Sequence, residues 1–166
     1  MSRNAPRLED LVRDRMFPSG DAARSTRATD HARNVFAVAQ QYRRAAEGAK
    51  RDGLSIPVTS NLHEAARLGI TAVAARNGLR FRNMEAAHEA VVDYAVAARL
   101  CTERHWAQLD QLRMIRNSGN YPADLIELTP ETILDMETVV DAVLRAAAAL
   151  VLGRPRVNSR PPAESR

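Results

Sequence analysis

The sequence predicts an all-α protein: an antiparallel helical bundle of five main helices preceded by a short N-terminal helix. Three observations support this fold class. Apolar residues recur in segment after segment at the three- and four-residue spacing of a helix face. Alanine supplies much of the 45% apolar content while aromatic residues make up only 4%, which favours helices packed closely through small side chains. The 166 residues show no strand-like alternation, no repeat and no glycine-rich phosphate loop.

The expected helices follow from the apolar stripes and from the turn residues between them. They cover residues 8–17, 29–51, 60–76, 84–100, 105–117 and 130–152. The first helix ends before Pro18, at a turn over residues 18–21. Thr29 or Asp30 is expected to cap the second.

Proline and capping residues set the expected start of the third helix. Residues 56–59 are expected to form an extended linker, because Pro57 lacks an N–H group and restrains the residue before it. The helix would then begin at a cap, Ser60 or Asn61, and Glu64 resembles the acidic member of a capping box.

The later boundaries rest on the same kinds of signal. Asn77-Gly78 is a helix stop, and residues 79–82 are expected to form a loop with two apolar anchors. Thr129-Pro130 fits a cap followed by proline at the first helical position. Residues 1–152 are therefore expected to form one domain, and the Pro- and Arg-rich tail over residues 153–166 is expected to be disordered.

Charge is unevenly placed along the chain. Residues 1–51 carry 11 Lys/Arg against 6 Asp/Glu, residues 52–152 carry 9 against 13, and residues 153–166 carry 4 against 1. The sequence pI of about 10.0 thus describes basic ends on a slightly acidic middle. Basic ends can attract a polyanion such as RNA. The preference for arginine, with Lys50 the only lysine, can also reflect no more than the coding composition of the genome.

Several classes of protein are not indicated. No apolar run reaches the roughly 18 residues of a membrane span. The N-terminus lacks the apolar segment of a secretory signal, so a cytoplasmic protein without membrane contact is expected. Cys101 has no second cysteine for a disulfide, and Cys101 with His105 would supply only two of the four ligands of a structural zinc ion. The sequence therefore predicts neither a metal site nor a cofactor.

The candidate functional site is the heptapeptide over residues 116–122, which lies between two predicted helices. The guanidinium of Arg116 can grip phosphate oxygens in a bidentate manner, and Asn117 can donate to the same group. Tyr121 can donate a hydrogen bond or stack on a base. The structural alternative is that Arg116 pairs with an acid, Asn117 ends its helix and Tyr121 packs on the bundle. The residues alone leave both interpretations open.

The chain from about Leu8 to Leu152 resembles a HEPN domain (higher eukaryotes and prokaryotes nucleotide-binding). Residues 109–117, followed by Tyr121, resemble the motif helix of a bacterial subgroup in which an Arg-Asn pair precedes a tyrosine. Residues 63–67 resemble part of the family's second helix. Residues 77–80 and 87–92 resemble the turn and the helix that follow it.

The resemblance implies an RNA- or nucleotide-binding protein, or a metal-independent ribonuclease of toxin–antitoxin type, that forms a homodimer through the motif face. On this basis Arg116 and Tyr121 would be the catalytic residues, and Arg116, Asn117 and Arg113 would bind phosphate. The alternative is a non-catalytic helical module that pairs with a nucleotidyltransferase-type antitoxin or another partner.

One departure from the family pattern bears on catalysis. Active HEPN members use Arg-x4-6-His, whereas Tyr121 stands at the matching position in this chain. A tyrosine with an unperturbed pKa of about 10 is ionised in only about one molecule in a thousand at pH 7, so it is a poor general base. The resemblance therefore predicts weak cleavage, or efficient cleavage only if tyrosine can serve as the catalytic group.

Overall fold

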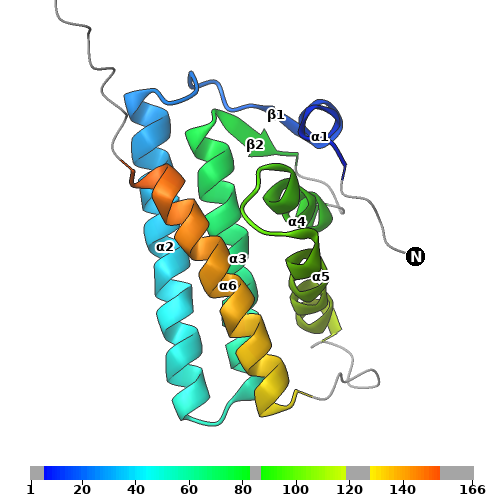
Figure 1. Ribbon diagram of the computed structural model, residues 1–166. Coiled ribbons are helices and arrows are strands. Elements are labelled where there is room, and N and C mark those ends of the chain that lie inside the picture. Colours follow the sequence, from blue (N-terminus) through cyan, green and yellow to red (C-terminus); the bar gives the residue numbers. More distant parts are fainter. Residues whose placement is uncertain (1–5, 83–86, 119–127, 154–166) are drawn as a thin grey trace, which may run out of the picture.

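The computed structural model describes residues 6–82, 87–118 and 128–153, apart from the side chains of Ala87, His88, Trp106 and residues 116–118. These ranges contain six helices and one two-stranded antiparallel sheet (Figure 1). In chain order they are α1 (Leu8–Arg15), β1 (Met16–Pro18), α2 (Thr26–Arg51), α3 (Ser55–Arg76), β2 (Leu79–Phe81), α4 (Ala87–Ala97), α5 (Glu103–Ser118) and α6 (Pro130–Val151). The predicted all-α fold class, with a short N-terminal helix and five longer ones, is confirmed.

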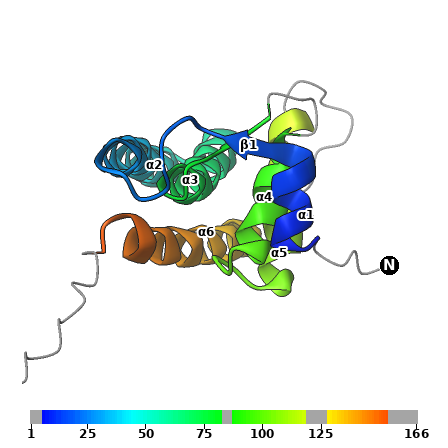
Figure 2. The same ribbon diagram turned by 90° about the horizontal axis from the view of Figure 1, so that it is seen from above.

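The centre of the bundle is built by α2, α3 and α6. Helices α2 and α3 run antiparallel in one layer, and α6 lies across them in a second layer (Figures 1 and 2). Ala32 and Ala39 of α2 are fully buried, as the alanine-rich stripes predict. Gly69 of α3 allows α6 to come close, because a Cβ atom there would lie 2.8 Å from the Cδ2 atom of Leu144.

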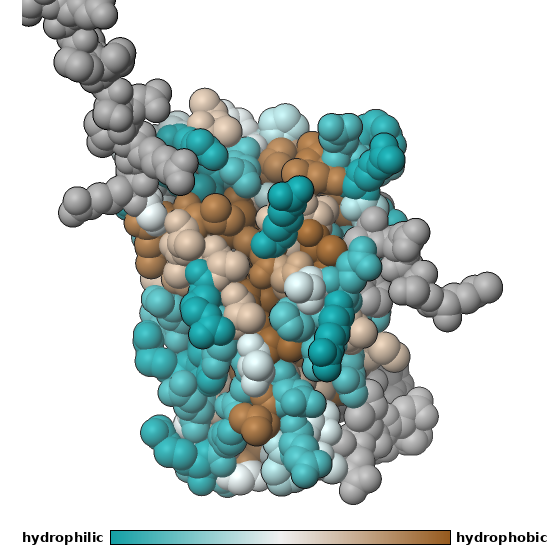
Figure 3. Space-filling view, viewed as in Figure 1, coloured by the Kyte–Doolittle hydropathy of each residue, from teal (hydrophilic) through white to brown (hydrophobic). Residues whose placement is uncertain are grey.

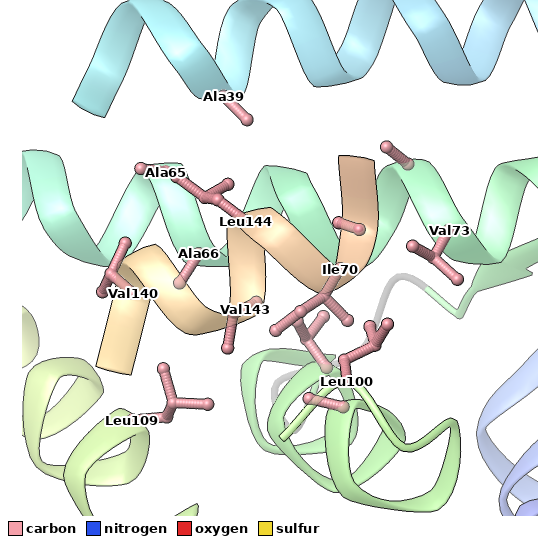
Figure 4. Close-up of a cluster of buried hydrophobic side chains, with 14 of the residues drawn as sticks. Ala39, Ala65, Ala66, Ile70, Val73, Leu100, Leu109, Val140, Val143 and Leu144 are labelled. Atoms are coloured by element: carbon pink, nitrogen blue, oxygen red, sulfur yellow. The ribbon is translucent and has the colours of Figure 1, made fainter. Parts of the chain in front are cut away.

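Branched side chains fill the space that these small residues leave. Val140 and Val143 of α6 lie in one cluster with Ala66 of α3 and Leu109 of α5 (Figure 4). Burying one such aliphatic side chain stabilises the fold by about 1.5–3 kcal/mol. The cluster therefore fixes the position of α5, the helix that carries the predicted motif.

The start of α3 differs from the prediction. Residues 56–59 are helical, because α3 begins at Ser55 rather than at Ser60 or Asn61. Pro57 lies in the first turn, where the N–H groups have no acceptor within the helix, so its missing N–H costs nothing. The first backbone bond of the helix is donated one residue later, from Val58 N to the carbonyl oxygen of Leu54 at 3.1 Å.

The predicted capping box is wrong for the same reason. Ser60 and Asn61 lie inside α3, and Glu64 is a mid-helix residue. Its Oε2 atom accepts hydrogen bonds from Arg67 Nε at 2.9 Å and Arg67 Nη2 at 2.7 Å. Glu64 therefore organises a side chain on the helix surface instead of capping a helix end.

A small β-ribbon replaces two other predicted features. The N-terminal helix ends at Arg15, and β1 pairs with β2 in the register Met16↔Phe81, Phe17↔Arg80 and Pro18↔Leu79. The segment predicted as a loop with two apolar anchors is therefore a strand. Three-residue strands are too short to show the alternation by which strands are recognised in a sequence.

The other boundaries of the described helices lie within three residues of the prediction. Thr129 caps α6 through its Oγ1 atom, which accepts from Thr132 N at 3.1 Å, and Pro130 occupies the first turn. None of the described helices is long and apolar enough to cross a membrane. The expected tail beyond Gly153 lies outside the described residues.

Candidate anion-binding groove

An open groove of about 630 Å³ lies between the start of α2, one side of α3 and strand β2. Its basic lining residues are Arg27, His31, Arg67, Arg80 and Arg82. Its apolar lining residues are Ala28, Ala75, Leu79, Phe81 and Val91, and Asp21 is the carboxylate that lines it. The volume falls within the range of about 300–1,000 Å³ that is usual for small-ligand sites.

Three elements deliver the basic side chains. Helix α2 starts at Thr26, earlier than predicted, because Ser25 Oγ accepts from Ala28 N at 3.2 Å. This early start places Arg27 and His31 four residues apart on the same side of the first turns.

Helix α3 and strand β2 carry other residues that line the groove. Arg67, Thr71 and Ala75 line the groove at four-residue intervals along α3. Gly78 makes the turn into β2 with a φ angle of +70°, and a Cβ atom there would lie 2.9 Å from the carbonyl oxygen of Asp21. The backbone of the 19–25 turn thus packs directly against the end of α3.

The groove arginines differ in how far their charges are cancelled. Arg27 Nη1 lies 3.7 Å from Asp21 Oδ1. Arg80 Nη2 donates to the carbonyl oxygen of Ser19 at 2.9 Å, and Arg82 Nε donates to that of Met16 at 3.2 Å. A carbonyl oxygen orients a guanidinium but carries no net charge, and within the described ranges neither Arg80 nor Arg82 pairs with a carboxylate.

Arg82 also lies near an acid outside the groove. Its charge contributes to the lowered pKa of Asp14, although the hydrogen bond from Arg13 contributes most. Arg13 Nε donates to Asp14 Oδ1 at 2.8 Å, so this carboxylate already has a cation of its own. The positive charge of the groove therefore remains in excess at β2.

Among the described groove arginines, Arg67 is the one that hydrogen-bonds a carboxylate directly, that of Glu64. His63 Nδ1 lies 3.4 Å from Glu64 Oε1, and Arg67 bonds the other carboxylate oxygen. The proximity of His63, together with the hydrogen bonds and charge of Arg67, lowers the pKa of Glu64 to about 2. Glu64 is therefore ionised at neutral pH and fixes the position of the Arg67 side chain.

An aromatic pair connects the apolar lining of the groove to the core of the bundle. The rings of Phe81 and Tyr94 meet edge to face with centroids 5.6 Å apart. Tyr94 is buried, which raises the pKa of its hydroxyl group, and that hydroxyl accepts a hydrogen bond from Asn77 Nδ2 at 3.2 Å. The end of α3, β2 and α4 are tied together at this point.

Among the predicted site residues, only Arg113 has a described side chain, and it lies on α5 and does not line the groove. Arg113 Nε donates to Asp110 Oδ1 at 2.7 Å, and its side chain is 26% exposed. Arg116 and Asn117 belong to the last turn of α5, but their side chains lie outside the described part of the structure, as does the whole of Tyr121. Of the predicted site, the structure thus shows Arg113 alone, and shows it paired with a carboxylate of its own helix.

A small pocket connects α5 with the edge of the groove. Leu109 and Leu112 of α5 line it together with His63 and Arg67 of α3. Arg67 therefore belongs both to the groove and to the contact between α3 and the motif helix.

A second group of charged residues lies between α2 and α6. Arg43 binds Asp141 in a bidentate manner, with Nε–Oδ1 at 2.6 Å and Nη2–Oδ2 at 3.0 Å. Glu137, whose side chain is 8% exposed, accepts a hydrogen bond from Lys50 and lies 3.8 Å from Arg43. Cations and carboxylates are matched in this cluster, so we interpret it as a structural clamp rather than a binding site.

Among the described residues, no group of three or more His, Cys, Asp or Glu side chains is placed to hold a metal ion. Comparisons with protein-family models, with curated proteins and with solved structures found no match.

Sequence reasoning missed the groove because its residues come from three separate segments. The charge count assigned Arg67, Arg80 and Arg82 to a slightly acidic middle, while the fold places them next to Arg27. The available signal was residues 79–82, in which two arginines alternate with two apolar residues, as in a half-buried strand.

Proposed function

We propose that this protein binds the phosphate groups of RNA or of a nucleotide in the groove lined by Arg27, Arg67, Arg80 and Arg82. One observation carries the proposal: four guanidinium groups converge on a groove whose described lining residues include a single carboxylate, that of Asp21. A guanidinium presents a planar fork that matches two phosphate oxygens, and each such charge-assisted contact contributes about 1.5–3 kcal/mol.

The ribonuclease activity that the HEPN resemblance implies is part of the same proposal. Arg116, Asn117 and Tyr121 would act on a strand that the groove holds, with Arg67 next to the contact between the groove wall and α5. The groove supplies affinity on this view, and the motif supplies whatever cleavage occurs.

The homodimer is also proposed, since a two-fold partner would bring a second groove and a second motif helix. A standard interface needs roughly 800 Å² from each partner. Hydrophobic residues gather over the upper half of the face drawn in Figure 3. Leu150 and Leu152, at the C-terminal end of α6, are about half exposed, so this end of the helix offers an apolar surface. Sedimentation of Leu150→Glu against the native chain tests this face, because an unchanged dimer would exclude it.

Binding of a short labelled RNA by fluorescence anisotropy tests the main proposal. Arg80→Ala is expected to weaken binding by about tenfold or more, and Arg80→Lys should restore it only in part because an ammonium lacks the planar fork. Arg44→Ala is the matched control, since Arg44 is an exposed arginine of α2 that does not line the groove. Equal losses for Arg80→Ala and Arg44→Ala would show that net charge, not the groove, binds RNA.

A further inference from the structure

The β-ribbon presents an aromatic ring on its outer face beside the groove. Phe17 of β1 lies directly opposite Arg80 of β2 in the antiparallel register. Residues that face each other across two strands project to the same side of the ribbon, with Cβ atoms about 5 Å apart. Met16, the neighbour of Phe17, is 1% exposed, whereas Phe17 is 40% exposed, so the Phe17 ring projects away from the core.

The charge next to this ring is held in position, and no carboxylate in the described part of the chain pairs with it. Arg80 Nη2 is held by the carbonyl oxygen of Ser19, two residues after Phe17, and Arg80 lines the groove. The outer face of the ribbon thus combines a flat apolar surface with a fixed guanidinium. Proteins that bind single-stranded nucleic acid use this combination, with bases stacked on aromatic rings and phosphates held by basic side chains.

We propose that the ribbon makes the groove selective for single-stranded RNA: an unpaired base stacks on Phe17 while the adjacent phosphate binds Arg80. The inference rests on the proposed phosphate-binding function of the groove. A base in a duplex is stacked between its neighbours and paired at its edge, so its face cannot reach Phe17. The arginines can still contact the phosphates of a duplex, and Phe17 therefore discriminates between the two forms.

The experiment uses one labelled RNA strand of mixed sequence in two states, alone and annealed to its complement. The native protein is expected to bind the single strand more tightly than the duplex at the same salt concentration. Phe17→Ala should weaken single-strand binding by roughly 5- to 150-fold, the range that corresponds to the loss of one stacked base. Duplex binding should stay unchanged in this variant.

Two further variants separate stacking from general effects. Phe17→Leu keeps an apolar side chain on the ribbon but removes the ring, so it should behave like Phe17→Ala, and Phe17→Trp should keep the selectivity. Tyr42→Ala is the matched control, because Tyr42 is an aromatic residue of α2 with a similar exposed fraction of 36% that does not line the groove. It should bind both forms like the native protein.

The possible failures are distinguishable. If Arg80→Ala leaves RNA binding unchanged, or if no RNA binds, the proposed function of the groove is wrong and this inference falls with it. If Arg80→Ala weakens binding but the native protein binds both forms equally, or Phe17→Leu weakens both equally, the groove binds phosphate without selecting single strands. A mononucleotide that competes as well as the single strand would likewise overturn the inference.

Discussion

Two groups of arginines in this small bundle have opposite electrostatic surroundings. Arg43 lies between α2 and α6, where Asp141, Glu137 and Glu47 all lie within 4 Å of its guanidinium. Arg80 and Arg82 lie on the ribbon, where their partners are backbone carbonyl oxygens. The residue type is the same, and the partner decides whether the charge holds the fold together or stays available to a ligand.

The comparison also explains why charge counting along the sequence was a poor guide. Arg43 belongs to the strongly basic first third of the chain, yet its charge is cancelled in the fold. Arg80 and Arg82 belong to the acidic middle, yet no carboxylate of the described residues pairs with them. A charge count along a stretch of sequence does not show which charges become neighbours in the fold.

The largest effect is expected from breaking the clamp. Arg43→Ala leaves Glu137 buried with Lys50 as its remaining partner and removes the bidentate bond to Asp141, so it should lower the free energy of unfolding by about 2–3 kcal/mol. Urea denaturation measures this loss. RNA affinity per folded molecule should not change, and a tenfold loss of affinity would show that the clamp belongs to the binding site.

A comparable effect, on binding rather than stability, is expected at the end of α5. Arg116→Ala should weaken RNA binding by about 1.5–3 kcal/mol if Arg116 holds phosphate. Arg113→Ala should cost less than about 1 kcal/mol, because Asp110 already pairs with Arg113. Titrations of the two variants side by side check this order. A larger loss for Arg113→Ala would mean that Arg113, and not Arg116, holds the phosphate.

The predicted motif also offers a test of catalysis. Tyr121→His introduces the residue type that active HEPN members use, so metal-independent cleavage of RNA should rise above that of the native protein. Cleavage is measured on bulk RNA in the presence of a chelator. A native rate equal to or above that of Tyr121→His would mean that tyrosine is itself an adequate catalytic group, or that the motif does not cleave.

A substitution at Gly78, in the turn that frames the groove, should destabilise the protein more than a substitution in an ordinary turn. Gly78→Ala combines a positive φ angle with contacts of 2.9–3.2 Å between the new Cβ and the backbone of Asp21 and Ala23, so it should lower the free energy of unfolding by roughly 2 kcal/mol. Gly53→Ala has a φ of +72° but no atom within 4 Å, so it should cost about 1 kcal/mol. Equal losses by thermal denaturation would contradict the close approach at Gly78.

The smallest effect concerns the acid that positions Arg67. The folded pKa of Glu64 is about 2, below the ordinary value of 4.5, so its contribution to stability is present above pH 4.5 and is lost as the pH falls toward 2. Glu64→Gln should destabilise the protein by on the order of 1 kcal/mol at pH 7. The difference from the native protein should shrink in acid, and a constant difference from pH 7 to pH 3 would contradict the lowered pKa.

The sequence predicted what depends on local signals. The apolar stripes and the cap at Thr129 gave the bundle, because helix periodicity and capping act over a few residues. It failed at Pro57, where two local rules compete: proline is excluded from a helix interior but is accepted in a first turn. It failed again at the ribbon, since three-residue strands form only when a distant partner is brought alongside: Phe17 pairs with Arg80, which lies 63 positions later in the chain.

The candidate site was harder to predict for the same physical reason. Arg27, Arg67 and Arg80 become neighbours only through the contacts between α2, α3 and β2. A short motif such as Arg116-Asn117 can be found in a linear sequence, whereas a groove assembled from three segments cannot. Cancellation of charge also depends on the fold, because the carboxylate that pairs with Arg43 lies 98 positions along the chain.

The salt dependence of RNA binding tests the central claim most directly. Each phosphate contact to a single strand contributes about −0.7 to the slope of log K against log salt concentration. The Arg80→Ala/Arg82→Ala variant should therefore lower the magnitude of the slope by about 1.4, while Arg44→Ala/Arg51→Ala, with the same change in net charge on α2, should leave it nearly unchanged. Equal slopes for both double variants would contradict the account, because arginines of the groove would then be no different from arginines elsewhere on the surface.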